Sequence, residues 1–273
     1  MDSVVVNKSE SRSPETRAVD PVWSRIREAA QQAAASEPVL AGTLHATILS
    51  QPRFEGALSY HLARLVGTTE VPAALIRQIF DEALNDDPSI GYAARADIVS
   101  VAARDPACTS YLDPLLWFKG YQALQTYRVA HWLWVRGRSD LAHYLQSRGS
   151  ALFGLDIHPG AVIGKSIFID HGTGVVIGET AVVEDGVSML HGVTLGGTGK
   201  ERGDRHPKVR RGVLLGAGAK VLGNIEIGAC AKVAAGSVVL APVPAGCTAA
   251  GVPARIIGCV DVPEPALEMD QRI

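Results

Sequence analysis

The stretch GVLLGAGAKVLGNIEIGACAKVAAGSVVL, residues 212–240, decides how this chain folds. An aliphatic residue recurs at every sixth position, at Leu215, Val221, Ile227, Val233 and Val239. A helix repeats its apolar positions about every 3.6 residues and a half-buried strand every two, so neither period fits. A six-residue repeat is instead the signature of a parallel β-helix, a solenoid in which each coil stacks on the one before.

The same period continues upstream, so the solenoid is long. It places aliphatic residues at Ile163, Ile169, Ile177, Val183, Met189 and Leu195. In the left-handed form that such repeats resemble, three hexads build one triangular coil, and neighbouring coils stack at the inter-strand spacing of about 4.8 Å. A β-sandwich would need longer strands with strict alternation. We therefore expect a left-handed parallel β-helix over residues 155–259.

Residues 20–154 carry a helical pattern, so the expected fold class is an all-α helical domain followed by the β-helix. Asp20 stands in an N-cap position before Pro21, and Val22, Ile26 and Ala29 follow on one face. Further helices are expected over 39–50, 55–66, 72–84, 91–103 and 114–136. The last is rich in aromatic residues, including Trp117, and aromatics at helical spacing favour packing over a cofactor site.

Composition and charge argue against several classes of function. The 273 residues have a formal net charge of -2, a pI near 6.4 and no long block of like charge, which argues against nucleic acid as a partner. Residues 1–19 lack the basic start and apolar core of a signal peptide, and no run of about 20 apolar residues could span a membrane. We expect a cytoplasmic protein with a disordered arm over 1–19.

The cysteines do not form a recognisable pattern. Cys108, Cys230, Cys247 and Cys259 show no C-x-x-C spacing. Neither a zinc knuckle nor a disulfide framework is indicated, and small buried or surface residues are the expected role of all four.

Two interruptions of the repeat mark where function is expected, because loops on a rigid scaffold carry binding and catalytic residues. The first is a two-residue slip after Ile169, at DHGTG, residues 170–174. The second is the excursion GTGKERGDRHPKVRRG, residues 197–212, in which Lys, Arg and His outnumber Asp and Glu. It lacks the glycine and the Ser or Thr that would complete a phosphate-binding P-loop. It is either a solvated loop or a site for an anionic substrate.

Two histidines fall in register within the solenoid. His171 and His191 occupy the same place in hexads one coil apart, so we expect them to stack at one corner. Stacked histidines can bind zinc between subunits, as in β-helical carbonic anhydrases. No glutamate or third histidine falls in an obvious register with this pair, so zinc is the weaker interpretation and we expect no metal.

Several motifs carry a resemblance to a known family. They are ADIVSVAARDPA (96–107), DIHPGAVIGKSIFIDHGTGVVIGETAVV (156–183), GDRHPK (203–208) and AAGVPARIIG (249–258). Together they resemble the serine acetyltransferases, the hexapeptide acyltransferases that begin cysteine biosynthesis. The resemblance covers about residues 20–260. It implies transfer of acetyl from acetyl-CoA to L-serine, giving O-acetylserine and CoA, with acetyl-CoA as co-substrate and no cofactor.

The resemblance also implies catalytic roles. His171 would be the general base that takes the proton of the serine hydroxyl. Asp156 would accept a hydrogen bond from the other ring nitrogen and hold the imidazole in the right tautomer. That contact rests on the resemblance, because counting hexads does not bring positions 156 and 171 together.

Substrate-binding residues follow from the same motifs. Arg205 and His206 would hold the serine carboxylate. Asp105 and Asp170 would face the serine ammonium. The acetyl-CoA contacts implied by the resemblance are Gly197, Ala217, Lys232 and Ala235, with Lys232 near the phosphates of CoA.

Assembly and regulation are further implications of the resemblance. The family forms trimers with active sites between subunits, and its helical domains pair two trimers, so we expect a trimer or a dimer of trimers. Cysteine would be a feedback inhibitor at the serine site. The acidic tail over 260–273 is expected to be flexible. Its terminal Ile273 would insert into O-acetylserine sulfhydrylase, forming the cysteine synthase complex.

Three other functions remain open at this point. A hexapeptide acyltransferase for another amine or alcohol would differ in the acceptor that it uses. A β-helical hydratase would need bound zinc. A purely structural scaffold would not need Asp156, His171 and the cationic excursion together.

Overall fold

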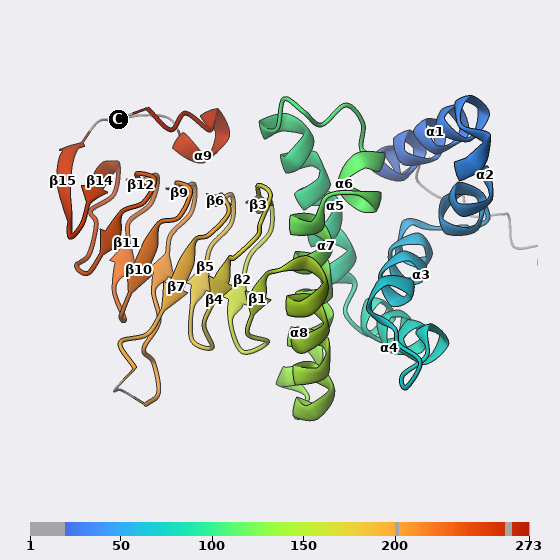
Figure 1. The fold of residues 1–273 in the computed structure, drawn as a ribbon, viewed down its shortest axis with the longest axis horizontal. Coiled ribbons are helices and arrows are strands. Elements are labelled where there is room, and N and C mark those ends of the chain that lie inside the picture. Colours follow the sequence, from blue (N-terminus) through green and yellow to red (C-terminus); the bar gives the residue numbers. More distant parts are fainter. Residues whose placement is uncertain (1–19, 200–201, 260–263, 273) are drawn as a thin grey trace, which may run out of the picture.

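The computed structural model describes residues 20–199, 202–259 and 264–272, and it has a helical part and a β part (Figure 1). The expected arm over 1–19 and the terminal Ile273 lie outside the described residues. The helical part contains α1 (Pro21–Ser36), α2 (Pro38–Leu44), η1 (His45–Leu49), α3 (Phe54–Val66), α4 (Ala73–Asp86), α5 (Pro88–Arg104), α6 (Leu112–Leu116), α7 (Lys119–Val135) and α8 (Ser139–Phe153). Within the described ranges, no helix is both long and apolar enough to cross a membrane.

Local caps explain where the helices begin. Asp20 accepts a hydrogen bond from the Trp23 N–H at 3.1 Å at the start of α1, and Asp87 accepts one from the Ser89 N–H at 3.0 Å at the start of α5. Two segments differ from the expected helices. The helix expected over 39–50 continues as the π-helical turn η1, and the helix expected over 114–136 is broken into α6 and α7.

The break between α6 and α7 has a tertiary cause. Helix α7 begins directly against strand β3 (Phe168–Ile169), where a Cβ at Gly120 would come within 2.2 Å of the Ile169 carbonyl oxygen. Only glycine allows this approach. Phe118 leaves helical geometry just before it, with φ -90° and ψ 104°. The contact with the solenoid therefore overrides the helical pattern of the segment.

The second part is a parallel β-helix of short strands. Besides β3, these are β1 (Asp156–Ile157), β2 (Val162–Ile163), β4 (Val176–Ile177), β5 (Val182–Val183), β6 (Ser188–Met189), β7 (Thr194–Gly196), β8 (Lys208–Val209), β9 (Leu214–Leu215), β10 (Lys220–Leu222), β11 (Glu226–Ile227), β12 (Lys232–Val233), β13 (Val238–Val239), β14 (Cys247–Gly251) and β15 (Ala254–Cys259). Sheet A has the order β1-β4-β7-β10-β13, sheet B the order β11-β8-β5-β2, and sheet C the order β15-β14-β12-β9-β6-β3. The fold class expected from the repeat, a helical domain followed by a parallel β-helix, is confirmed.

The aliphatic residues of the six-residue period form the core of the solenoid. All of the positions that the period marks, from Ile163 to Val239, are buried. In sheet C, Met189 is paired with Ile169 on one side and with Leu215 on the other. Each core position therefore stacks on its equivalent in the next coil, as the repeat predicts.

Side chains of the helical part close the open edge of the first coil. Backbone groups that point away from the stack have no neighbouring strand there, and each one left unpaired in a buried place costs about 1–3 kcal/mol. The Tyr127 hydroxyl donates to the Ala161 carbonyl at 2.5 Å, and Arg128 Nη2 donates to the Gly164 carbonyl at 2.8 Å. Helix α7 thus supplies the donors that a further coil would otherwise supply.

Asp97 of α5 completes this cap and is fully buried. Its carboxylate accepts a hydrogen bond from the Ile167 N–H at 3.0 Å and lies 2.6 Å from Arg128 Nη2. Gln125 adds a third hydrogen bond at 2.9 Å. A buried charge is tolerated when it is paired and hydrogen-bonded, so this network joins α5, α7 and the first coil in one arrangement.

The far end of the solenoid carries the antiparallel hairpin β14–β15 (Figure 1). Cys247 and Cys259 stand opposite each other on its two strands and form a disulfide. The expectation that these cysteines are unpaired is therefore wrong. The pair depends on the register between two adjacent strands, which a search for C-x-x-C spacing does not reveal.

Residues 264–272 run back along sheet C and include the short helix α9 (Pro265–Glu268) (Figure 1). Ala266 is buried; its carbonyl accepts a hydrogen bond from Ser188 Oγ at 2.8 Å, and its N–H donates to the Gly212 carbonyl at 3.3 Å. The flexible tail expected over 260–273 stays a prediction, and in the structure its residues 264–272 have partners on the solenoid. Residues 260–263 lie outside the described residues.

Replacing Arg128 by Met tests the cap. The variant leaves the Asp97 charge buried without its partner, so we expect the free energy of unfolding to fall by about 3–5 kcal/mol. Arg138→Met is the matched control, because Arg138 and Glu82 form an exposed pair at 3.1 Å that is worth at most about 1 kcal/mol. Urea denaturation followed by circular dichroism measures both. Equal, small losses would show that the buried pair does not hold the two parts together.

Candidate active site

The corner between sheets C and A carries the polar pair Asp170 and His171. The DHGTG loop leaves β3 here and turns into β4, and His171 has φ +56°, in the left-handed region that residues other than glycine seldom occupy. Such conformations are held in place by their surroundings and cluster at functional sites. The His171 side chain is 74% exposed, with Nε2 at 3.7 Å from Asp170 Oδ1. Its imidazole can therefore meet a substrate.

His191 stands one coil further along the same corner. The ring centroids of His171 and His191 are 5.9 Å apart with an interplanar angle of 61°. The stacking that the hexad count predicts is confirmed. Among the residues that the structure describes, no group of three or more histidine, cysteine, aspartate or glutamate side chains is arranged to hold a metal ion.

A cavity of about 420 Å³ opens beside His171. It brings together Asp105, at the C-cap of α5, with Asp170 and His171 from the corner loop. Lys119, the first residue of α7, lines the same cavity and donates a hydrogen bond to Thr173 Oγ1 of the loop. The structure thus assembles three of the sequence-predicted site residues from segments far apart in the chain.

The two carboxylates give this cavity its electrostatic character. Burial is the main cause that raises the pKa of Asp170; among its neighbours, the charges of His171 and His191 lower that pKa and the charge of Asp105 raises it. A cation placed between the two carboxylates would therefore relieve their repulsion. The cavity suits a positively charged substrate group.

Trp117, which the sequence pattern assigned to packing, lines this cavity. Its side chain is 55% exposed and lines the cavity together with Phe118 and Lys119. The aromatic spacing of the segment predicted an unbroken buried helix, and only the approach of Gly120 to β3 reveals that the chain opens at this point. Gly120, two residues after Phe118, is the local signal in the sequence.

Asp156 lies on β1 and is held from the helical part. Its Oδ1 accepts a hydrogen bond from Gln146 Nε2 of α8 at 2.7 Å. Within the described residues, no hydrogen bond joins Asp156 to His171. The structure therefore places this carboxylate firmly, in contact with a partner that the sequence did not suggest.

His206 occupies the other corner of sheet A, where the chain passes to sheet B. It is buried, and the Thr180 N–H donates to its Nδ1 at 3.1 Å, so Nδ1 is an acceptor and the ring proton of the neutral form lies on Nε2. Burial lowers the pKa of His206, and the charge of Arg205 lowers it further. At neutral pH the imidazole is a neutral donor, which suits an anionic substrate group.

Arg205 lies beside His206 and is oriented by two contacts. Its Nη2 donates to Glu179 Oε2 at 2.7 Å and its Nη1 donates to the Gly203 carbonyl at 3.1 Å. Two other cations of the excursion are paired: Lys208 contacts Asp204 at 2.5 Å, and Arg210 contacts Glu184 at 2.8 Å. The excursion is therefore partly a solvated loop and partly a support for one arginine and one histidine.

The two corners lie at opposite ends of the strands of sheet A. Asp105, Asp170 and His171 meet at the corner before β4, whereas Arg205 and His206 lie at the corner that follows it. Gly197 belongs to the second corner as well, because a Cβ there would lie 3.3 Å from Arg205 Cγ. One chain therefore does not bring all the sequence-predicted site residues into one cavity.

Ala217 and Ala235 continue the corner that carries the two histidines. Each follows a core residue of sheet C by two positions, as His171 follows Ile169, and these core residues are paired in register from coil to coil. The corner thus presents His171, His191, Ala217 and Ala235 in that order. We call this row the histidine–alanine column.

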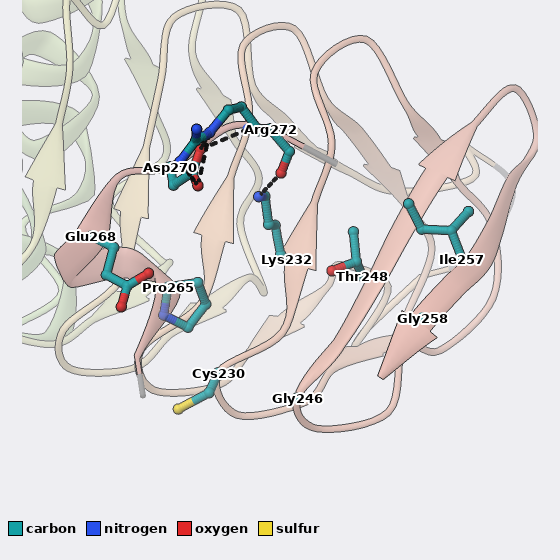
Figure 2. Close-up of a pocket in the computed structure, with 10 residues that line it drawn as sticks. All are labelled: Cys230, Lys232, Gly246, Thr248, Ile257, Gly258, Pro265, Glu268, Asp270 and Arg272. Atoms are coloured by element: carbon teal, nitrogen blue, oxygen red, sulfur yellow. Dashed lines mark hydrogen bonds and ion pairs between the residues drawn. The ribbon is translucent and has the colours of Figure 1, made fainter. Parts of the chain in front are cut away.

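Lys232 lies further along sheet C, beside a second cavity of about 340 Å³. Figure 2 shows its side chain directed toward the tail, where Nζ donates to the Arg272 carbonyl. Asp270 and Arg272 form an ion pair at 3.0 Å on the same side. The tail therefore forms one wall of this cavity and the last coils of the solenoid form the other.

Comparison with known proteins points to one family. A family model described as "Serine acetyltransferase, N-terminal" matches residues 22–126. Serine acetyltransferase of Escherichia coli (strain K12) is 54% identical over 250 residues, covering 92% of each chain, and that of Haemophilus influenzae is 53% identical, covering 92% of this chain and 94% of the relative.

Solved structures give the same result. The structure of serine acetyltransferase from Vibrio cholerae matches with a TM-score of 0.91 and 55% identity, covering 92% of this chain and 97% of the other. A serine acetyltransferase complex with coenzyme A from Brucella abortus matches with a TM-score of 0.86 and 56% identity, covering 89% and 98%. A serine acetyltransferase complex with cysteine matches with a TM-score of 0.91 and 53% identity, covering 92% and 98%.

Gly178→Ala tests how His206 is held. A Cβ at position 178 would come within 2.1 Å of His206 Cδ2, so the ring must leave its buried place. We expect the pKa of His206 to rise toward its ordinary value near 6.5, because burial no longer disfavours the charged form. An NMR titration measures it. Gly42→Ala is the control, since nothing lies within 4 Å of that site. An unchanged pKa in Gly178→Ala would contradict this packing.

Proposed function

The chain belongs to the serine acetyltransferase family and transfers acetyl from acetyl-CoA to L-serine, and we propose how its residues share that reaction. His171 is the general base. It takes the hydroxyl proton as the serine oxygen attacks the thioester carbonyl; the C–S bond then breaks and its electron pair goes to the sulfur of CoA. The observation that carries this assignment is the exposed imidazole beside a cavity with two carboxylates. A positioned base contributes about 10² to 10⁴ in rate.

Asp156 is the group that orients His171. Two observations support this role: β1 pairs with β4, the strand that follows the corner loop, and the Gln146 hydrogen bond holds the Asp156 carboxylate in place. In this role it accepts a hydrogen bond from the ring N–H of His171 and stabilises the imidazolium that forms. The thioester is an activated acyl donor, so direct attack needs no covalent enzyme intermediate.

Serine binds between two subunits. Asp105 and Asp170 face its ammonium, which the acidic cavity supports. Arg205 and His206 hold its carboxylate, through the guanidinium fork and the Nε2–H of the imidazole. One chain keeps these two pairs at opposite ends of the strands of sheet A. The second pair therefore comes from a neighbouring chain. A trimer, alone or paired into a dimer of trimers, supplies that arrangement.

Acetyl-CoA lies along the histidine–alanine column. The small side chains of Ala217 and Ala235 leave room for the pantetheine arm, and Gly197 approaches it from the neighbouring subunit. Lys232 meets the phosphates at the far end. The relative from Brucella abortus, solved with coenzyme A, supports a CoA site in this fold. No metal or other cofactor takes part in this scheme.

Regulation and partners complete the proposal. Cysteine, which one structural relative binds, occupies the serine site as a feedback inhibitor. The C-terminal tail, ending in Ile273, inserts into O-acetylserine sulfhydrylase. The protein works in the cytoplasm.

His171→Ala tests the base. We expect kcat to fall by about 10² to 10⁴ with L-serine, because proton removal is lost. CoA release is measured with acetyl-CoA and L-serine, homoserine or amino sugars, which also separates serine acetyltransfer from transfer to another acceptor. His45→Ala, at an exposed position in η1, is the control, and both variants should keep the oligomer size of the wild type. Near-normal turnover of His171→Ala contradicts the assignment.

Deleting Ile273 alone tests the partner. The deletion leaves α9 intact, so we expect CoA release to stay unchanged while binding to O-acetylserine sulfhydrylase, measured by isothermal titration calorimetry, is lost. Leu267→Ala, at an exposed position of α9, is the matched control and should bind normally. Unchanged binding after the deletion would remove the tail from this role.

A further inference from the structure

His191 has no role in the scheme above, yet it stands where the two substrates must meet. It occupies the second place of the histidine–alanine column, one coil from His171, and it is exposed. Coils are about 4.8 Å apart, so a pantetheine arm that reaches His171 along Ala235 and Ala217 passes His191 last. The inference rests on the proposed path of acetyl-CoA.

Acetyl transfer needs a group that takes a proton from the serine oxygen and a group that gives a proton to the sulfur of CoA. His171 faces the serine oxygen in the cavity, on one side of the thioester carbon. The sulfur leaves on the other side, toward the alanines. The electron pair left on the sulfur must be stabilised as the C–S bond breaks. The His191 side chain lies on the same side as the sulfur. An imidazolium is in general a stronger acid than a thiol by about two pKa units, so net transfer of the serine proton from the His171 imidazolium to the thiolate is downhill.

The surroundings favour a proton shared between the two rings. Rings with centroids 5.9 Å apart are too far apart for a direct hydrogen bond between their nitrogens, but one bridging water can pass a proton from one ring to the other. Asp170 feels the charge of both histidines, so it stabilises the proton on either ring. Asp105 adds a second negative charge to the cavity, and Lys119 adds a positive one on the side of Thr173.

We propose that His191 is a second catalytic residue, which delivers a proton to the departing sulfur of CoA. The serine proton moves to His171 as the C–O bond forms. As the C–S bond breaks, neutral His191 gives its ring proton to the sulfur from one nitrogen and receives the proton of His171 on the other. The proton has then passed from serine oxygen to CoA sulfur, and both imidazoles are neutral. Exchange with water resets the tautomer of His191.

The test compares two acyl donors. A selenol is a stronger acid than a thiol, so acetyl-seleno-CoA loses its leaving group without a proton. In His191→Asn we expect kcat/KM with acetyl-CoA to fall by about 10², and the loss with acetyl-seleno-CoA to be about tenfold smaller. Circular dichroism and oligomer size confirm that the variant folds, and His191→Gln provides a second replacement of similar polarity.

His171→Asn is the matched control, because removal of the base slows attack on either donor. Equal losses of His191→Asn with both donors would make His191 a positioning residue and overturn the relay. An undiminished rate with acetyl-CoA would overturn it as well. Activity of His171→Asn near the wild-type value would instead refute the proposed base, so failure of the two proposals can be told apart.

Discussion

The buried pair of Asp97 and Arg128 is the interaction on which the relation between the two parts depends. It lies where two helices meet the first coil, and it satisfies backbone groups that no strand can reach. The charges are tolerated only because each is paired and hydrogen-bonded. Once they are in place, the first coil has one position relative to α5 and α7. Asp105 at the end of α5 then lies opposite Asp170 of the solenoid, and the cavity between them follows.

Because the solenoid repeats, the position of the first coil also determines the positions of the later coils. Each coil places its corner residues directly beyond those of the preceding coil, so side chains distant in sequence form straight rows. The candidate site lies at the exceptions in these rows, which are two histidines where the later coils have alanine, and a polar excursion where other coils have a plain corner. A scaffold this regular lets a few substitutions create a site without disturbing the core.

The sequence predicted those features that depend on the repeat. The buried rows from Ile163 to Val239 and the contact of His171 with His191 both follow from counting hexads. The sequence pattern could not predict the features that depend on contacts between elements. The opening at Trp117 arises from the packing of Gly120 on β3, and the disulfide of Cys247 arises from strand register. The meeting of Asp105 with Asp170 came from family resemblance, because no local pattern relates a helix end to a solenoid corner.

The cap described for the first coil also governs assembly. An uncovered coil is a β-edge whose donors and acceptors match those of any other coil, including the coils of a second molecule. Head-to-tail stacking of such edges does not close on itself and grows into a filament. Tyr127 and Arg128 occupy carbonyl groups of the first coil, and at the other end sheet C finishes in the antiparallel strand β15 instead of a further parallel strand, so neither place offers the plain edge of a coil. Association of copies along the flanks of the solenoid, as in the proposed trimer, leaves these end contacts undisturbed.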